Sequence, residues 1–383
     1  MILQPLKILM TDPHLRGGGQ VRYVGNLARE LTAMGHDVTI GCKPGSVLVD
    51  RAREAGCGVA DRFAFRSGLR REWRQDIVEA RRCLLYDMPD IVHVSGSQDH
   101  WLFGGVNRLL GYATCLVRTR HNTYAVKSGL PNRILNRRWT DFQIVVCQTV
   151  CDDLARHPAF DAQRLFPIHN GVDAELFKPD ADARQKIRAE FGYGENHVVC
   201  GIVPRLVPAK GHDFLFQAVA QLKDRRPELR VLVLGQGDRE TELQRLGADL
   251  GIGPLVRFAG FRDDMAACVQ AIDIGAQPSV DCDTSSFSLK EQMAAEKPVI
   301  ASDYGGLTEI VDDGVEGIVV PAGTVEPLAN ALERLLGDPE LRAHMGVAGR
   351  RRVLRDFTVH VFASRTVEAY RRALEIHRER FAH

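Results

Sequence analysis

Hydrophobic and polar residues follow a repeating order along most of the chain. Short apolar runs, each about the length of a strand, alternate with longer stretches in which apolar residues recur at helical spacing. The helix after the first run is marked by Val21, Val24, Leu27, Ala28, Leu31 and Met34. In the first half the predicted strands lie near Leu6–Met10, Asp37–Gly41, Ile91–Val94, Cys115–Thr119 and Ile144–Cys147. This alternation predicts parallel sheets built from strand–helix–strand units.

The pattern breaks once, at Pro158, Pro167, Pro179 and the polar run Lys178–Asp182, and then restarts. Further strands are predicted near Val198–Val203, Val231–Leu234, Leu255–Phe258, Ile272–Gly275, Pro298–Ala301 and Gly317–Val320. From Asp338 onward the chain is Arg-rich and helical. We therefore expect an α/β protein with two doubly wound, Rossmann-like domains, residues 1–177 and 178–357. Ligands of such folds bind at the carboxyl ends of the strands, so a cleft between the two sheets is expected.

Composition and charge narrow the class of protein. A length of 383 residues exceeds a comfortable single core, and the net charge of +1 argues against a nucleic-acid partner. Residues 1–180 carry 24 basic and 19 acidic side chains, a net +5, and the remainder carries 26 and 30, a net −4. This asymmetry favours an anionic acceptor or membrane surface for the first half.

Cysteine usage and hydropathy predict where the protein works. The nine cysteines include no pair with CxxC spacing, which predicts a reducing compartment without disulfides. The first residues have neither the basic segment nor the cleavage site of a signal peptide, and no apolar run is long enough to span a bilayer. We expect a cytoplasmic protein.

The block Gly201–Gly211 is the first candidate for chemistry. A strand ends at Val203, and Arg205 and Lys210 follow on the loop before a helix that begins near His212. Two cations there could grip both phosphates of a diphosphate, at about 1.5–3 kcal/mol for each charge-assisted contact. A solvated basic loop is the alternative.

A second block, Gln277–Ala295, combines a polar loop with a helix start. Thr284, Ser285 or Ser286 could cap this helix, whose free amides would suit a phosphate. Asp283 before the helix could bind sugar hydroxyls, and Glu291 within it could accept ribose hydroxyls. A surface salt-bridging carboxylate is the alternative for Glu291.

Three smaller features follow other strands. Gly17, Gly18 and Gly19 could allow close backbone approach and positive φ, or form a plain tight turn. Gly235 and Gly237 make a lone GxG, without the third glycine of a dinucleotide fingerprint. His121 could contact a sugar or transfer a proton, although a structural role is the more ordinary one. The remaining histidines have no ligand spacing, so we expect no metal.

Taken together, these blocks resemble the retaining glycosyltransferases of family 4, which have the GT-B architecture. The matches run in order along nearly the whole chain: Gly17–Gly19, Asp90–His93, His121, Asn170–Phe177, Arg205 with Lys210, Gly235–Gly237, Phe258–Phe261, Pro278–Ser279, Glu291–Ala294, Pro298–Ala301 and Gly305–Glu309. Each match is modest, and their order and spacing make a chance origin improbable.

The resemblance implies a role for each candidate. Arg205, Lys210, Gly235 and the helix start at Ser286, Phe287, Ser288 and Leu289 would hold the diphosphate of a nucleotide-sugar donor, and Glu291 its ribose. Phe261 and Arg262 would lie beside the base, Gly18 and Gly19 near phosphate or acceptor, and His121 near the donor sugar. No metal or other cofactor is implied. A terminal helix from about residue 358 to 383 would cross back onto the first domain.

Two positions depart from the family pattern. Asp283 stands where the family has the first glutamate of its Glu-seven-Glu element, and Ser288 stands where a glycine is usual. A carboxylate one methylene shorter puts the donor-sugar contact in doubt.

Two other functions occur with this fold. A sugar-nucleotide epimerase would need acid and base groups at the sugar, for which His121 and Asp283 are the candidates. A nucleotide-sugar sensor would bind without transfer. The acceptor is expected to be a saccharide or a lipid-linked molecule.

Two basic segments are candidates for membrane contact. They are the stretch Arg66–Arg82 and the trio Arg133, Arg137 and Arg138, which could dock on anionic lipid or be solvated helix faces.

Overall fold

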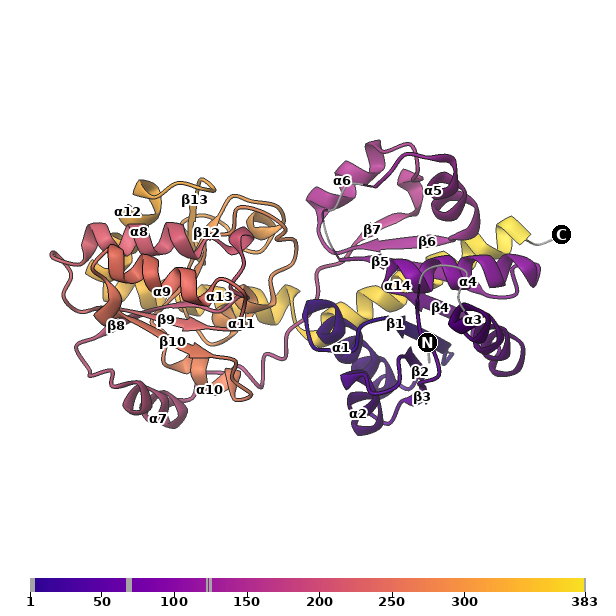
Figure 1. Ribbon diagram of the computed structural model, residues 1–383, viewed down its shortest axis with the longest axis horizontal. Coiled ribbons are helices and arrows are strands. Elements are labelled where there is room, and N and C mark those ends of the chain that lie inside the picture. The colour runs from indigo at the N-terminus through magenta and orange to yellow at the C-terminus, as the bar shows by residue number, and fades with distance from the viewer. Residues whose placement is uncertain (1–3, 67–70, 122, 124–125, 382–383) are drawn as a thin grey trace. The chain divides into compact units, whose positions relative to one another are not determined.

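The chain forms two compact units in a computed structural model that describes residues 4–66, 71–121, 123 and 126–381 (Figure 1). The first unit comprises Met1–Gly171 together with Val359–His383, and the second comprises Val172–Thr358. Each unit is built around one parallel sheet with helices on its faces. The fold class predicted from the alternating pattern is therefore confirmed.

The first unit contains a seven-stranded sheet with the order β3-β2-β1-β4-β5-β6-β7. Its strands are β1 Lys7–Asp12, β2 Asp37–Cys42, β3 Gly58–Ala60, β4 Ile91–Val94, β5 Cys115–Arg120, β6 Phe142–Val145 and β7 Leu165–Pro167. Its helices are α1 Gly19–Ala33, α2 Val47–Glu54, α3 Arg71–Arg82, α4 Ser97–Leu109, α5 Leu130–Ile134, α6 Gln148–Arg156 and α14 Val359–Phe381, with shorter turns η1 Cys83–Asp87, η2 Leu135–Trp139 and η3 Ala162–Arg164.

The second unit contains a six-stranded sheet with the order β10-β9-β8-β11-β12-β13. Its strands are β8 Val198–Ile202, β9 Leu229–Leu234, β10 Val256–Gly260, β11 Ile274–Gln277, β12 Val299–Ser302 and β13 Gly317–Val320. Its helices are α7 Ala181–Phe191, α8 His212–Leu222, α9 Glu240–Asp249, α10 Met265–Gln270, α11 Phe287–Ala294, α12 Glu326–Gly337 and α13 Pro339–Asp356, with the turns η4 Pro208–Lys210, η5 Gly253–Leu255 and η6 Leu307–Glu309.

The sequence pattern missed two strands of the first sheet. Both β3 and β7 are three residues long and lie at the sheet edges. Such short runs carry too few apolar residues to show a period, and Pro167 in β7 is a residue that sequence reasoning assigns to loops. These segments are strands because they pair with the neighbouring strands, which a local sequence pattern does not show.

The boundary between the units lies earlier than the sequence suggested. We had expected the first domain to end at residue 177, but the chain enters the second unit at Val172. Val172, Ala174 and Phe177 are buried in a hydrophobic cluster with residues of α11 and β12. The prolines that signalled a linker therefore do not mark the boundary, because burial of these three side chains fixes the segment to the second core.

The last helix, α14, completes the first unit. It packs on α1 and on strands β5 and β6. Tyr370 of α14 is fully buried and hydrogen-bonds through its hydroxyl to Nδ1 of His93 on β4 at 2.6 Å. The other ring nitrogen of His93 meets Thr119 Oγ1 at 2.6 Å. The terminal helix is thus tied to the sheet by a buried polar contact as well as by apolar packing.

Two further observations concern the chain as a whole. Among the described residues, no helix combines the length and the apolar character that a bilayer crossing requires. All nine cysteines have free thiols, and eight of them are buried.

Burial of His93 makes the stability of the first unit depend on pH. Desolvation, assisted by the charge of Arg118, lowers the pKa of His93 to about 3. The unfolded chain takes up this proton near pH 6.5, so stability is lost as the pH falls from about 6.5 towards 3, by up to about 1.4 kcal/mol per pH unit. We expect His93→Gln to reduce this slope in urea titrations between pH 7 and 4.5.

The exposed His344 provides the matched control. His344→Gln should leave the slope of the wild-type protein unchanged. Equal slopes for wild type and His93→Gln would show that His93 is not neutral in the folded state.

Candidate functional site

Polar side chains meet where the winding of the second sheet reverses. Strands β8 and β11 are neighbours in this sheet although a long stretch of chain separates them. Lys210 follows β8, and Asp283 follows β11. Open parallel sheets bind their ligands at this reversal, outside the carboxyl ends of the strands. The predicted phosphate-binding loop and the predicted carboxylate therefore belong to one site.

Glycines bring the loops of this site into direct contact. Gly211 has a φ of +69°, and a Cβ there would lie 1.9 Å from the carbonyl oxygen of Pro278. Gly305 has a φ of +59°, and a Cβ there would lie 2.0 Å from the carbonyl oxygen of Asp283. Because any larger residue would push these backbones apart, glycine at both positions sets the spacing of the loops after β8, β11 and β12.

Lys210 and Asp283 form the central contact of the site. The Nζ of Lys210 lies 2.9 Å from Oδ2 of Asp283, whose side chain is 5% exposed. The same oxygen accepts hydrogen bonds from Gln277 Nε2 at 2.8 Å and Ser279 Oγ at 2.7 Å. Three donors thus converge on one carboxylate oxygen, and Asp283 holds the ammonium group of Lys210. The binding of sugar hydroxyls by Asp283 stays a prediction.

The start of α11 joins this network. Ser286 is the N-cap, as one of the three predicted alternatives, and its Oγ accepts from the amide of Leu289 at 3.2 Å. Ser288 lies within 3.1 Å of Ser286 through the hydroxyls and donates to Gln277 Oε1 at 2.9 Å. Gln277 therefore links the first turn of α11 to Asp283. The serine that replaces the usual glycine contributes a hydrogen bond of its own.

Glu291 is buried, at 1% exposure, in the second turn of α11. The alternative of a surface salt-bridging carboxylate is therefore wrong. Its neighbour Lys290 is also fully buried, with Nζ donating to Ser285 Oγ at 2.8 Å and lying 5.3 Å from the Phe357 ring. No sequence pattern predicts a buried lysine at this position, because charged residues on a short helix ordinarily face solvent.

Arg205 and Gly235 lie at the same edge of the sheet as Lys210. Arg205 is exposed on the loop after β8. Gly235 directly follows β9 with a φ of +130°, and its amide donates to the carbonyl oxygen of Gly260 at 2.9 Å. A Cβ on Gly235 would lie 2.8 Å from the carbonyl oxygen of Pro204. The loop that carries Arg205 therefore rests against β9.

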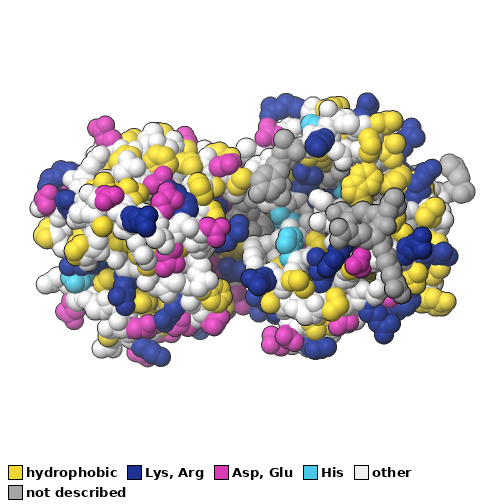
Figure 2. All heavy atoms as spheres, viewed as in Figure 1, with side chains coloured by type: hydrophobic (Ala, Val, Ile, Leu, Met, Phe, Trp, Pro, Cys, Tyr) yellow, Lys and Arg dark blue, Asp and Glu magenta, His cyan; other side chains and the backbone are white. Residues whose placement is uncertain are grey.

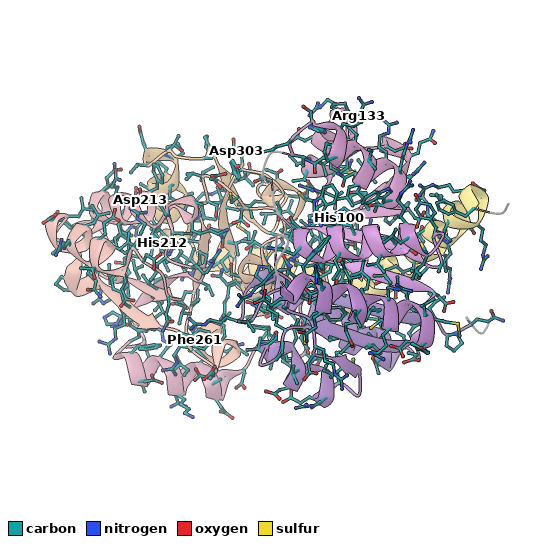
Figure 3. The ribbon with its side chains drawn as sticks, turned by 45° about the vertical axis from the view of Figure 1, so that its right-hand side comes forward. His100, Arg133, His212, Asp213, Phe261 and Asp303 are labelled. Carbon is teal, nitrogen blue, oxygen red and sulfur yellow. The ribbon has the colours of Figure 1, made fainter. Side chains whose placement is uncertain are left out.

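The two residues expected beside the base behave differently from each other. Phe261 follows β10 and is 64% exposed, so its ring is open to a ligand (Figure 3). Arg262 donates to Glu190 at 2.6 Å and to Asp264 at 2.8 Å, and it lies over the ring of Phe191. These carboxylates raise the pKa of Arg262 above its usual value. Two carboxylates and a ring already hold this guanidinium, which gives it a structural role between α7 and α10.

The glycine turn of the first unit differs from expectation. Gly17, Gly18 and Gly19 are exposed, and none of them has a φ in the left-handed region that favours glycine. A Cβ on any of the three would meet nothing within 4 Å. The fold of this unit therefore does not itself demand glycine there, and the backbone at the start of α1 stays open to a ligand.

His121 follows β5 at the carboxyl edge of the first sheet. Its ring packs edge-on against Tyr23 of α1, with centroids 4.6 Å apart. Desolvation, with the nearby charge of Arg118, lowers the pKa of His121 well below its usual value. The imidazole is therefore neutral and weakly basic at neutral pH, and its contact with the donor sugar stays a prediction.

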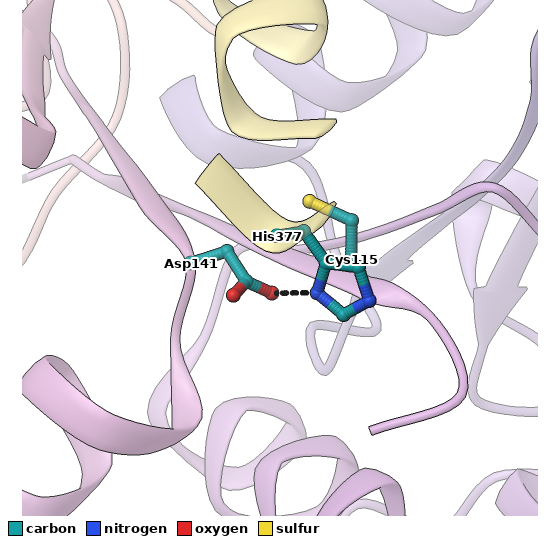
Figure 4. A group of neighbouring side chains, drawn as sticks. All are labelled: Cys115, Asp141 and His377. Atoms are coloured by element: carbon teal, nitrogen blue, oxygen red, sulfur yellow. Dashed lines mark hydrogen bonds and ion pairs between the residues drawn. The ribbon is translucent and has the colours of Figure 1, made fainter. Parts of the chain in front are cut away.

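The fold also assembles a group of potential metal ligands that sequence spacing could not reveal. Cys115, Asp141 and His377 place one ligand atom each within 4.8 Å of one another (Figure 4). Asp141 already accepts from His377 Nδ1 at 3.0 Å, Arg380 at 2.5 Å and the amide of Leu116 at 2.9 Å. Burial raises the pKa of the Cys115 thiol well above its usual value. These contacts indicate that Asp141 anchors α14 to the first sheet, and they argue against a metal centre.

Comparison with known proteins agrees with this architecture. The family description "Glycosyltransferase Family 4" matches residues 17–176, and "Glycosyl transferases group 1" matches residues 183–352. The chain is 29% identical to a D-inositol 3-phosphate glycosyltransferase of Streptomyces avermitilis, over 99% of this chain and 90% of that relative. The chain belongs to glycosyltransferase family 4. It is accordingly a transferase enzyme.

Solved structures show the same fold for this family 4 glycosyltransferase. A glycosyltransferase from Rickettsia africae superposes with a TM-score of 0.87 at 20% identity, over 97% of this chain and all of that one. The Anabaena protein HepE in complex with UDP superposes with a TM-score of 0.82 at 22% identity, over 95% of this chain and 99% of that one. Both support the GT-B assignment.

The loop contact at Gly211 allows a stability test of the site. We expect Gly211→Ala to destabilise the second unit severely, because the new Cβ would clash with the Pro278 carbonyl. The matched control is Gly192→Ala, at a φ of +74° with nothing within 4 Å. That substitution should cost about 1–2 kcal/mol from backbone strain alone. Urea unfolding of both variants measures the difference, and equal losses would mean that the loops are not in contact.

Proposed function

We propose that this glycosyltransferase is a retaining enzyme that moves a sugar from a nucleoside diphosphate to a hydroxyl of a saccharide or lipid-linked acceptor. The observation that carries the proposal is the placement of Lys210. Its ammonium group is fixed at the reversal point of the second sheet by Asp283, next to the start of α11. A positioned cation beside the N-terminus of a helix suits the diphosphate of the donor.

Lys210 remains able to bind phosphate while it is paired. An ammonium group has three donors, and one of them points to Asp283. The others, with Arg205 and the amides of α11, would stabilise the charge that grows on the departing diphosphate. Pre-positioned donors of this kind usually contribute the largest part of the rate enhancement.

The hydrogen bonds of Asp283 argue against a covalent intermediate on this carboxylate. A carboxylate oxygen that accepts three hydrogen bonds is a poor nucleophile, because its lone pairs are engaged. The acceptor hydroxyl would then attack from the face that the diphosphate leaves and give its proton to a phosphate oxygen. Side-chain cations supply the positive charge, so the proposed reaction needs no metal.

The comparisons support the donor class. The Anabaena protein was solved with UDP. The Streptomyces relative is named for a phosphate-bearing acceptor. A role in the synthesis of cell-envelope polysaccharide or glycolipid in the cytoplasm fits such reactions, and the free cysteines suit that reducing compartment.

Lys210→Ala tests the proposal. Loss of the ammonium should lower sugar transfer by at least about a hundredfold and weaken nucleoside diphosphate binding, because a charge-assisted contact is lost. Lys186→Ala on the exposed face of α7 is the matched control and should retain full activity. Calorimetry with nucleoside diphosphates and a transfer assay measure the two effects. Full transfer activity in Lys210→Ala would end the assignment.

The same assays separate the two alternatives. An epimerase would convert the donor alone to its epimer, and a sensor would bind nucleotide without transfer to any acceptor. Both alternatives would leave Lys210→Ala deficient in binding, so product analysis decides between them.

We further propose that α4 and the segment α5–η2 dock on an anionic membrane. No carboxylate occurs between Asp99 and Asp141, and this stretch exposes Arg108, Lys127, Arg133, Arg137 and Arg138. Leu109 and Leu130 in the same stretch are 80% and 67% exposed. Basic and hydrophobic side chains adjoin one another on the visible face of this unit (Figure 2). Basic residues with exposed apolar side chains bind the lipid interface.

The other basic stretch, Arg66–Arg82, is less suited to lipid. Arg66 pairs with Glu72 at 3.6 Å, and Arg82 pairs with Glu79 at 2.9 Å and with Asp87 at 3.4 Å. These pairs offset part of the positive charge that the sequence displays.

Vesicle sedimentation tests the membrane proposal. A variant with Arg133, Arg137 and Arg138 changed to Gln should bind anionic vesicles roughly a hundredfold more weakly, at about 1 kcal/mol per charge removed. The control changes the exposed Lys186, Arg245 and Arg351 of the second unit to Gln, with the same loss of charge. Equal binding by both variants would remove this surface from consideration.

A further inference from the structure

Two arginines on β5, the buried Arg118 and the partly buried Arg120, have no ion-pair partner among the described residues. Arg118 and Arg120 alternate with Thr119, so both project from the same side of the strand near its carboxyl end. Arg118 is 7% exposed, and one of its terminal nitrogens donates to the carbonyl oxygen of Gly96. Its Nε and the Nε of Arg120 are buried and have no hydrogen-bond partner. Within the described part of the chain, neither guanidinium forms an ion pair.

The carboxylate whose charge acts on Arg118 is engaged elsewhere. Asp99 Oδ2 accepts from Thr11 Oγ1 at 2.7 Å and from the amides of Ser95 and Gly96 at 3.0 and 3.1 Å. A buried charge is ordinarily paired, since transfer of an ion out of water is expensive. The Arg120 guanidinium lies over the ring of Phe160, 5.5 Å from its centroid, but this ring carries no charge. Two arginines on one strand that no ion pair offsets therefore indicate an anion site.

The pKa values of Arg118 and Arg120 also reflect the cost of burying a positive charge. Burial lowers the pKa of Arg120 to about 10, with a smaller contribution from the charge of Arg118. Burial also lowers the pKa of Arg118. Both remain cations at neutral pH, so the fold retains two positive charges in a site that disfavours them. A negatively charged ligand would offset this penalty.

Neighbouring strands contribute two more polar atoms without partners. The hydroxyl of Ser95, directly after β4, is buried and unpaired. The Oε1 atom of Gln143 on β6 is also unpaired, and Gln143 stands opposite Arg118 in the strand pairing. Ser95, Arg118 and Arg120 thus place donors near the carboxyl ends of two adjacent strands, where Rossmann-like folds bind ligands. Arg120, which is partly exposed, provides access from solvent.

We propose that Arg118 and Arg120 bind a phosphate group carried by the acceptor, with the Ser95 hydroxyl as a further donor. This inference rests on the proposed function, because it makes the first unit the acceptor-binding unit. Arginine suits the task, since its planar fork of donors matches two phosphate oxygens. The phosphate of a soluble sugar phosphate and that of a lipid headgroup share this chemistry.

Titration with inorganic phosphate tests the site in the full chain. The titration is done in the Lys210→Ala background, so that the second unit contributes least, and calorimetry measures the affinity. We expect one saturable phosphate site, with a Kd at least about tenfold higher after Arg120→Gln. Arg118→Lys keeps the charge and loses the fork, and it should weaken binding as well. The exposed Arg245→Gln on α9 is the control and should bind as the parent does.

Several results would overturn the inference. Absence of saturable phosphate binding would do so, as would binding that neither Arg120→Gln nor Arg118→Lys changes; both results would mean that internal water satisfies these groups. If Arg118→Lys does not fold, as circular dichroism would show, the half-buried Arg120→Gln still decides.

The outcomes separate this inference from the proposed function. If phosphate binding is insensitive to both arginines while nucleoside diphosphate binding depends on Lys210, the phosphate site alone fails. If phosphate binding depends on Arg120 while nucleotide binding ignores Lys210, the donor assignment alone fails. Transfer to glucose 1-phosphate, compared with transfer to phosphatidylinositol vesicles, then distinguishes a soluble acceptor from a lipid.

Discussion

The ion pair between Lys210 and Asp283 depends on the order of strands in the second sheet. β8 and β11 are adjacent because the chain reverses its winding direction between them, and the loops after both strands emerge at the same edge. Because Gly211 and Gly305 have no side chain, the backbones of the neighbouring loops approach them more closely than a Cβ atom would allow. The ammonium group is consequently held by the sheet topology, by two glycines and by one carboxylate oxygen.

The two units handle buried charge in different ways. In the second unit, Lys210, Asp283, Gln277 and Ser279 satisfy one another, which produces a site that is ordered before a ligand arrives. Electrostatic catalysis benefits from such order, since no reorganisation is needed during the reaction. In the first unit, Arg118 and Arg120 have no such partner. The polar groups around Lys210 and Asp283 are satisfied without a ligand, whereas we propose that Arg118 and Arg120 are paired only when an anion binds.

Much of the fold could be read from the sequence, because hydrophobic periodicity reports burial directly. The long strands and α1 were predicted close to their observed bounds. The three-residue strands β3 and β7 were not, since their pairing is decided by neighbours. The domain boundary was misplaced because prolines indicate turns, whereas the burial of Val172 and Phe177 determines to which core a segment belongs.

The candidate site, too, could be predicted from the sequence only in part. The sequence determined which residue types follow which strands, and so placed Arg205, Lys210, Asp283 and Ser286 at the carboxyl edge of a parallel sheet. Only the tertiary structure decided which of them touch: Asp283 holds Lys210, Arg262 is taken by Glu190 and Asp264, and Glu291 is buried. Contacts between residues far apart in the chain leave no periodic trace in the sequence, because they arise from strand order and backbone approach and not from local spacing.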